Sequence, residues 1–178
     1  LLAAEAALGF ALGDRRAHAL LGALGSDCVF FHAARATGFA RCTGRGEIVE
    51  PLATPTTLPH VLVVTPQCGA PPASVYRALS LPLRNGEPAR SLSRDAPATA
   101  LAAARASFFN RLEEAALAAI PELRAWRALF DAHEASHLRL SGSGSSFFGV
   151  FERADEALVV RPALLAASAR RGLRARGA

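Results

Sequence analysis

The sequence predicts an α+β fold in which helices cover one face of an antiparallel sheet. Three observations lead to this prediction: a short β-branched run at residues 60–65, helical patterns at 99–118 and 121–133, and two apolar segments that flank a Gly/Ser turn within 138–151. The resulting order of strand, helix, helix, strand, strand and helix is typical of such sandwiches. With 178 residues, of which 51% are hydrophobic, the chain can bury a substantial core.

The first part of the chain is expected to be helical. Residues 1–24 show leucine and alanine at helical spacing. Gly13 and Asp14 interrupt this pattern, so we predict that Asp14 caps a second helix over residues 15–24. Gly25 follows the last leucine and is expected to end that helix as a left-handed C-cap.

The next segment is expected to contain strands and a turn. The apolar run from Val29 to Phe31 begins a predicted strand, and residues 35–41 alternate loosely enough to form another. Residues 43–47, Thr-Gly-Arg-Gly-Glu, are expected to turn the chain because glycine favours turns.

The predicted domain boundary lies in a loop that prolines punctuate. Pro51, Pro55 and Pro59 interrupt any regular spacing of apolar residues. We therefore divide the chain into one domain of residues 1–58 and another of residues 59–178.

The second domain opens with a buried strand at residues 60–65. Ser74 is predicted to cap a short helix that carries Val75 and Tyr76. Residues 80–98 are rich in Pro, Arg, Ser and Asn and show no periodicity, so we expect an exposed, mobile loop.

Helical patterns return after this loop. Residues 99–118 are predicted to form a long helix, and Pro121 is predicted to begin another, since proline is tolerated in a first helical turn. After the hairpin at 138–151, residues 153–176 are expected to be helical, with Pro162 interrupting them. The helix that begins at Pro121 is expected to bury Leu123, Trp126, Leu129 and Phe130.

Two residue types are absent from the chain. Because there is no Met, Leu1 is not expected to be the translational start, and the chain is either processed or a piece of a longer protein. There is no Lys either, since all 20 basic residues are Arg. This absence excludes any mechanism that needs a lysine of this chain, such as a P-loop lysine or a Schiff base.

Cysteine and hydropathy patterns indicate a cytoplasmic protein with no membrane partner. The three cysteines, Cys28, Cys42 and Cys68, form no CxxC pair and are interpreted as reduced thiols. No apolar stretch reaches the length of a membrane span without a charge or a breaker, and the first residues lack the basic region of a signal peptide.

Neither a metal site nor a nucleic-acid site is predicted. His133 and His137 would share a helix face, but no HExxH pattern accompanies them, so they are interpreted as surface or helix-end histidines. The net charge of +5 is concentrated in the last 18 residues, which contain no acid. No aromatic residue is interleaved with this tail, so we interpret it as a solvated, frayed end and keep a nucleic-acid arm as an alternative. Its arginines are Arg161, Arg170, Arg171, Arg174 and Arg176.

Three polar sites stand out: Gly25-Ser26-Asp27, the turn at 43–47, and Ser-Gly-Ser-Gly-Ser-Ser at 141–146. Asp27 lies between a helical pattern and an apolar run, where a carboxylate can serve as a turn cap or as a catalytic base. Glycines in the last site allow the backbone to approach a ligand, and successive N–H groups can form an anion nest. Taken singly, each site also has an ordinary structural interpretation.

In this order and spacing, the motifs resemble those of the GHMP small-molecule kinases. The resemblance covers about residues 1–155. The matching stretches are LGSDCVFF at 24–31, GRGE at 44–47, the strand end at Pro66 followed by Val75-Tyr76, NRLE at 110–113, and SGSGSSFFG at 141–149.

The resemblance implies a fold and a reaction. Residues 1–58 would be the remainder of the family's N-terminal domain, and residues 59–178 its ferredoxin-like C-terminal α/β sandwich. The branch with this combination of motifs uses ATP and Mg²⁺ to phosphorylate a hydroxyl of a cytidine-diphosphate-linked methylerythritol in the non-mevalonate isoprenoid pathway. The implied partners are therefore ATP and a small cytidine-diphosphate substrate.

The resemblance also implies roles for individual residues. Asp27 matches the family's catalytic aspartate, which accepts or orients the proton of the substrate hydroxyl. Tyr76 matches an aromatic residue that stacks on the cytosine ring. The third family motif, which shapes the wall of the active site, is matched by Gly142, Ser143, Gly144 and Ser145.

The chain departs from the family pattern at several points. The Gly/Ser-rich phosphate loop and the lysine that pairs with the catalytic aspartate are absent, as expected if the front third of the kinase is missing. Val29 replaces a usual Pro, Pro72 replaces a Thr that contacts substrate, and Arg111 replaces an Asp or Ala. The alternatives are a non-catalytic remnant or interaction module, a GHMP kinase for another alcohol, and the nucleic-acid binder considered above.

Overall fold

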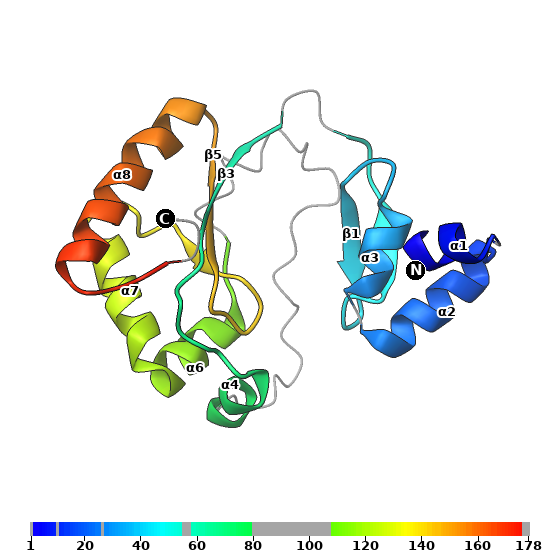
Figure 1. Ribbon diagram of the computed structural model, residues 1–178, viewed down its shortest axis with the longest axis horizontal. Helices are drawn as coiled ribbons and strands as arrows, with labels where there is room; N and C mark the ends of the chain where they lie inside the picture. The colour runs from blue at the N-terminus through cyan, green and yellow to red at the C-terminus, as the bar shows by residue number, and fades with distance from the viewer. Residues whose placement is uncertain (1, 10, 26, 55–57, 80–107, 176–178) are drawn as a thin grey trace, which may run out of the picture. The chain divides into compact units, whose positions relative to one another are not determined.

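The computed structural model describes residues 2–9, 11–25, 27–54, 58–79 and 108–175 (Figure 1). The chain divides into two compact units, Leu1–Thr56 and Thr57–Ala178, called here the first and the second unit. Both contain helices and strands. None of the helices in the described ranges has the length and apolar character that a membrane crossing requires.

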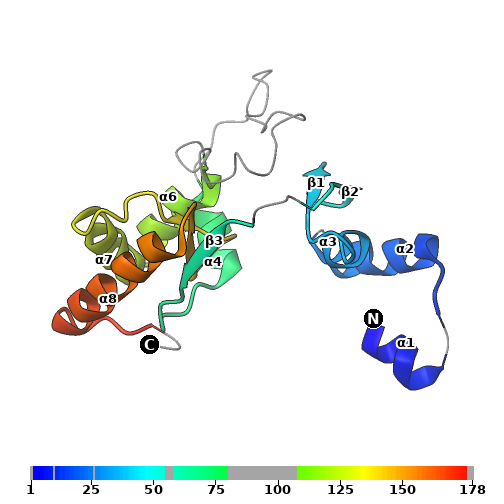
Figure 2. The same cartoon turned by 90° about the horizontal axis from the view of Figure 1, so that it is seen from above.

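The first unit combines short helices with a two-stranded hairpin. Strands β1 and β2 pair antiparallel, with Cys42 opposite Val49. Helix α3 lies beside this hairpin, as Figure 2 shows. The elements are α1 (Leu2–Leu8), α2 (Asp14–Leu24), α3 (Cys28–Ala33), β1 (Ala40–Thr43) and β2 (Ile48–Pro51).

The predicted strand at Val29–Phe31 is wrong, because these residues belong to helix α3. Val29 and His32 are buried three positions apart, whereas Phe31 is 73% exposed, which is a helical and not an alternating pattern. An apolar run this short does not distinguish strand from helix by its periodicity. The other predicted strand, at 35–41, begins only at Ala40.

The helix ends around α2 also differ from expectation. Helix α2 begins at Asp14 itself, and Gly13 is the N-cap. Gly25 has φ 172° and ψ 148°, which is extended backbone and not the predicted left-handed conformation. Its N–H donates to the carbonyl of Leu21 at 3.0 Å and closes the last helical turn.

The predicted turn at residues 43–47 is confirmed and joins β1 to β2. Gly44 and Gly46 have φ of 70° and 117°, which glycine adopts without strain. The Glu47 carboxylate accepts a hydrogen bond from the N–H of Arg45 at 2.6 Å. The backbone N–H groups of Glu47 and then of Arg45 hold the pKa of Glu47 below its usual range. The motif at 44–47 is therefore accounted for by the hairpin turn.

The second unit is the predicted sandwich of helices on an antiparallel sheet. The sheet has the order β3-β5-β4, and Figure 1 shows α6, α7 and α8 along one side of β3 and β5. The elements are β3 (His60–Val64), α4 (Pro72–Ala78), α6 (Arg111–Ala119), α7 (Pro121–Asp131), β4 (Arg139–Leu140), β5 (Phe147–Phe151) and α8 (Ala154–Arg170).

The core of the second unit lies between the sheet and these helices. Along β3, Leu62 and Val64 pack against the core, whereas Val61 and Val63 are 55% and 59% exposed. This alternation follows from the two-residue period of a strand. The predicted burial of Leu123, Trp126, Leu129 and Phe130 on α7 is confirmed.

Helix boundaries in the second unit differ from the prediction at two places. Helix α4 begins at Pro72 and has no side-chain cap, so Ser74 is not its N-cap. Helix α6 begins at Arg111, since residues 108–110 are not helical. The rest of the long helix predicted at 99–118 and the loop predicted at 80–98 lie outside the described residues. The predicted start of α7 at Pro121 is confirmed.

The arginine-rich tail is anchored as far as residue 175, contrary to the frayed end that we expected. After α8, Gly172 adopts φ 67° and the chain turns back. The N–H of Gln67 donates to the carbonyl of Arg174 at 2.8 Å, and Pro66 forms a β-bridge with Ala175. Pro162 lies inside α8 and does not end it.

Candidate functional site

The Gly/Ser turn, residues 141–146, joins β4 to β5. The N–H of Ser141 donates to the carbonyl of Ser146 at 2.8 Å, and the N–H of Gly144 donates to the carbonyl of Ser141 at 2.9 Å. Gly144 has φ 96°, and a Cβ added there would lie 3.1 Å from a methyl carbon of Leu140. The backbone conformation therefore requires glycine at position 144, and a side chain there would also displace the Leu140 methyl group.

The turn is fastened to the end of β3 by two hydroxyl groups. Ser145 Oγ donates to the carbonyl of Pro66 at 3.2 Å. The hydroxyl oxygens of Ser146 and Thr65 share a hydrogen bond of 3.0 Å. Serine residues of the motif therefore position it against the neighbouring strand.

Part of the turn's backbone remains available to a ligand. Within the described ranges, no atom accepts a hydrogen bond from the N–H groups of Gly142, Ser143 or Ser145. N–H donors this close together in a turn are suited to bind the oxygens of an anion such as phosphate.

Asn110 connects the Gly/Ser turn to helix α6. Its Nδ2 donates to the carbonyls of Leu140 at 2.8 Å and Gly142 at 2.7 Å. Its Oδ1 accepts from the N–H of Leu112 at 2.9 Å and caps the helix. The resemblance matched Asn110 as the first residue of the NRLE stretch, a helix start in the family, but its bonds to Leu140 and Gly142 were not foreseen.

Glu113, in the first turn of α6, holds strand β4 next to the Gly/Ser turn. Its Oε2 accepts from the N–H of Leu140 at 2.9 Å, and its Oε1 lies 3.7 Å from Nη1 of Arg127. The side chains of Glu113 and Arg127 are 15% and 14% exposed, so little solvent screens this ion pair.

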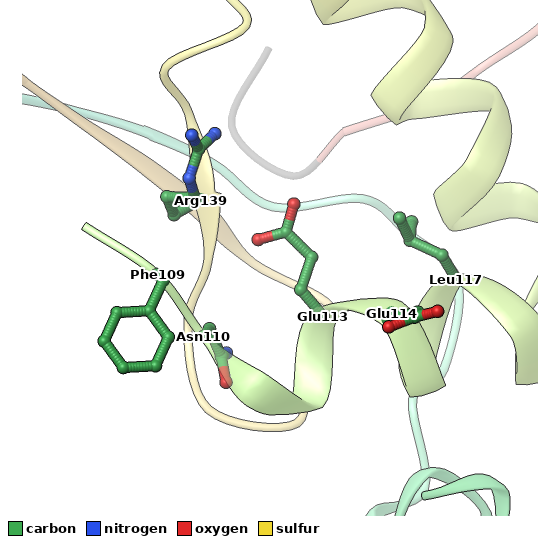
Figure 3. Close-up of a pocket in the computed structure, with 6 residues that line it drawn as sticks. All are labelled: Phe109, Asn110, Glu113, Glu114, Leu117 and Arg139. Carbon is green, nitrogen blue, oxygen red and sulfur yellow. The ribbon is translucent and has the colours of Figure 1, made fainter. Parts of the chain in front are cut away.

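An open pocket of about 330 Å³ lies beside these residues (Figure 3). Two of its three charged side chains already have partners: the Arg139 guanidinium donates to the carbonyls of Phe108 and Ser136, and Glu113 is bonded as above, whereas Glu114 is exposed. We therefore do not assign the reaction to this pocket. The residues that line it are Phe109, Asn110, Glu113, Glu114, Leu117 and Arg139.

Tyr76 lies on α4, in the same unit as the Gly/Ser turn. Val75 is fully buried, whereas Tyr76 is 59% exposed. Helix α4 packs against α6. The ring of Tyr76 therefore presents a face on which a flat ligand can stack.

Asp27 lies in the first unit, between α2 and α3. Its side chain is exposed and, among the described residues, makes no capping hydrogen bond to α3. The turn is closed instead by the backbone, since the N–H of Cys28 donates to the carbonyl of Gly25 at 3.1 Å. The carboxylate is therefore not needed as a turn cap.

Asp27 also acts on a neighbouring thiol. Burial raises the pKa of the Cys42 thiol, and the negative charge of Asp27 raises it further. A raised pKa keeps Cys42 protonated to a higher pH than an ordinary cysteine and lowers the fraction of reactive thiolate.

Replacing Asp27 with Asn is expected to lower the pKa of Cys42 and to speed its alkylation a few-fold at pH 8, because the repelling charge is removed. Peptide mass spectrometry after a short pulse of iodoacetamide measures this rate. Cys68 is an internal reference, since burial and Glu122 raise its pKa. An unchanged rate at Cys42 would show that the charge of Asp27 does not act on this thiol.

Another polar cluster of the first unit was not foreseen from the sequence. Nε2 of the buried His32 lies 3.2 Å from Oδ1 of Asp14 and 3.3 Å from Nη1 of Arg35. It connects the start of α2 to the end of α3. The expected residues thus lie in both units: Asp27 in the first, and Tyr76 with Gly142, Ser143, Gly144 and Ser145 in the second.

The chain is similar to one protein family over most of its second half. Residues 90–169 match the family described as GHMP kinases C terminal. A crystal structure of 4-(cytidine 5'-diphospho)-2C-methyl-D-erythritol kinase superposes with a TM-score of 0.64 at 34% identity, covering 93% of this chain and 58% of that one.

Curated relatives carry a related name, 4-diphosphocytidyl-2-C-methyl-D-erythritol kinase. The relative from Cereibacter sphaeroides is 38% identical over 133 residues, covering 74% of this chain and 45% of its own length. The relative from Thermus thermophilus is 35% identical over 153 residues, covering 83% of this chain and 51% of its own length. The chain thus spans about half the length of the curated relatives that it matches.

Proposed function

Because the chain belongs to the GHMP kinase family, we propose that its native protein transfers the γ-phosphate of ATP to a hydroxyl of 4-diphosphocytidyl-2-C-methyl-D-erythritol. The observation that carries this proposal is the structural match to a 4-(cytidine 5'-diphospho)-2C-methyl-D-erythritol kinase. The match covers 93% of this chain and therefore includes parts of both units. The curated relatives support the same substrate. A non-catalytic remnant and a kinase for another alcohol have no comparable support.

The reaction belongs, in this proposal, to non-mevalonate isoprenoid biosynthesis in the cytoplasm. The cytoplasmic assignment rests on the three cysteines, Cys28, Cys42 and Cys68, whose odd number and lack of a CxxC pair suit reduced thiols.

In the proposed reaction, Asp27 accepts or orients the proton of the substrate hydroxyl as its oxygen attacks the γ-phosphorus. A carboxylate is a weak base for an alcohol, so the proton moves late, after most of the P–O bond to the leaving group has broken. The exposed, uncapped carboxylate of Asp27 supports this role.

The Gly/Ser turn supplies charge stabilisation in the same proposal. Phosphoryl transfer depends mainly on positioning and on stabilising the charge of the equatorial oxygens. In this proposal, the N–H groups of Gly142 and Ser143 bind phosphate oxygens, and donors that the turn holds in place need no reorganisation during the reaction.

Magnesium enters the proposal only with the nucleotide. The described residues contain no group of three or more His, Cys, Asp or Glu side chains that could hold a metal ion. Because Mg²⁺ is usually bound by substrate phosphates with only one or two carboxylates, we assign it in this proposal to the phosphates of ATP.

The proposed function is tested by incubating the native protein with ATP and 4-diphosphocytidyl-2-C-methyl-D-erythritol and identifying the phosphorylated product by mass spectrometry. Mevalonate and galactose serve as competing alcohols. Phosphorylation of one of these alone would overturn the proposed substrate, and no transfer to any alcohol would overturn the kinase itself.

Replacing Tyr76 with Ala is expected to weaken binding of the cytidine substrate by about 1–3 kcal/mol, because a base then loses its stacking partner. The measurement is the Michaelis constant for this substrate at saturating ATP. Tyr76→Phe is the matched control, since it keeps the ring and should retain most of the affinity. A normal Michaelis constant in Tyr76→Ala would argue against stacking at this position.

A further inference from the structure

We infer that Asn110 is a positioning residue that sets the direction of the N–H groups in the Gly/Ser turn. Its side chain bonds to backbone groups of Leu140, Gly142 and Leu112. It acts through the turn by hydrogen bonds to the carbonyls of Leu140 and Gly142. This inference rests on the proposed function only for the identity of the phosphate that the turn receives.

The orientation of the Asn110 amide is fixed by its three partners. Oδ1 faces an N–H donor, that of Leu112, and Nδ2 faces two carbonyl acceptors. The reverse orientation would bring an oxygen against both carbonyls and a donor against an N–H, so it is excluded by the network. A side chain used only for capping needs just the acceptor, which Ser or Asp would provide equally well.

The bond to Gly142 determines where the next N–H points. In a planar trans peptide, the carbonyl and the following N–H point in opposite directions. Because the carbonyl of Gly142 is held 2.7 Å from Asn110, the N–H of Ser143 is directed away from α6. That N–H is one of the donors without an acceptor among the described residues.

The bond to Leu140 works in the same way at the entrance of the turn. With the carbonyl of Leu140 held at 2.8 Å from Asn110, the N–H of Ser141 points away from α6 and reaches the carbonyl of Ser146. Glu113 holds the N–H of Leu140 from the same helical turn. Figure 3 shows Asn110 and Glu113 together at the start of α6, next to β4. The first turn of α6 therefore fixes the shape of the Gly/Ser turn.

The test compares Asn110→Ser and Asn110→Asp with the native protein. Serine is as good an N-cap as asparagine but is too short to hold both carbonyls, so α6 is retained while the turn is released. Aspartate keeps the length and the cap but removes both donors. Glu114→Gln, an exposed neighbour on α6, is the control and should change nothing.

Two measurements separate positioning from simple loss of stability. Amide hydrogen exchange of Ser141 is expected to rise ~10-fold in both variants, while exchange along β3 and β5 stays at the native level. The turnover number is expected to fall ~10-fold or more, with the Michaelis constant for the alcohol unchanged.

The inference would be overturned if the amide of Ser141 exchanged at the native rate in Asn110→Ser. It would also be overturned if the exchange rates rose equally throughout the second unit. Raised exchange with native turnover would also overturn it, because the turn would then be released without consequence. A native protein that transfers no phosphate would overturn the proposed function, whereas the exchange measurement would still decide whether Asn110 holds the turn.

Discussion

Replacing Asp27 with Asn is expected to lower the rate of phosphate transfer by ~100-fold or more, which corresponds to about 2.7 kcal/mol of transition-state stabilisation. Asparagine keeps the size of the side chain but cannot take the proton of the substrate hydroxyl. The fold should persist, because Asp27 is exposed and its side chain makes no capping bond among the described residues. The turnover number and a thermal melt followed by circular dichroism measure the two effects.

The matched control for this experiment is Asp14→Asn, in the same unit. Asp14 is 77% exposed; its Oδ1 lies 3.2 Å from Nε2 of His32 and 4.0 Å from Nη1 of Arg35, and an amide oxygen can also accept from these groups. Its replacement should leave turnover near the native value. Full activity in Asp27→Asn would assign Asp27 a structural role and would remove the main residue from the proposed mechanism.

Replacing Phe147 with Ala is expected to reduce the free energy of unfolding of the second unit by about 3–5 kcal/mol. Phe147 is fully buried, lies opposite Val64 and Leu140 in the sheet, and packs edge-to-face on Phe130 with ring centroids 5.0 Å apart. Its removal leaves a cavity that the surrounding strands and helices cannot fill. Urea denaturation followed by circular dichroism measures the change.

Phe109→Ala is the control for this substitution, because Phe109 is 51% exposed. Its replacement should change the unfolding free energy by only about 0.5 kcal/mol. A loss below about 1 kcal/mol in Phe147→Ala would mean that the core tolerates the cavity, contrary to the close packing of this region.

The second unit could be predicted from its sequence because its signals are local and strong. Pro121 marks the start of α7, and the residues at helical spacing on that helix are the buried ones. Leu138 and Leu140 alternate with polar neighbours before a Gly/Ser turn and a second apolar run, which is a hairpin signature. Three of the five stretches that carry the family resemblance also lie in the second unit.

The errors fall where the local sequence is ambiguous. Val29 to Phe31 is apolar and β-branched or aromatic, yet it forms a helix because burial of Val29 and His32 on one face outweighs its strand preference. The arginine-rich composition around Arg174 predicts a solvated end, but a backbone hydrogen bond with Gln67 and a β-bridge with Pro66 anchor this segment. Such contacts join residues more than 100 positions apart, and no local pattern records them.

The candidate site could be predicted only in part. The Gly/Ser turn was foreseen as a polar site, since glycine and serine repeats at a strand end are visible in the sequence. The role of Asn110 was not, because its two carbonyl partners lie about 30 positions away. The assignments of Asp27 and Tyr76 came from the resemblance and remain proposals.

The chain has a single tryptophan, Trp126, which is 2% exposed in the core of the second unit. Its indole packs near Phe130, with ring centroids 5.8 Å apart. Intrinsic fluorescence excited at the indole absorption band is therefore a reporter of the second unit alone and is silent for the first. On melting of the second unit, this emission shifts to longer wavelengths. Circular dichroism of the same sample records the loss of helix from the whole chain, so comparing the two signals distinguishes the melting of the two units.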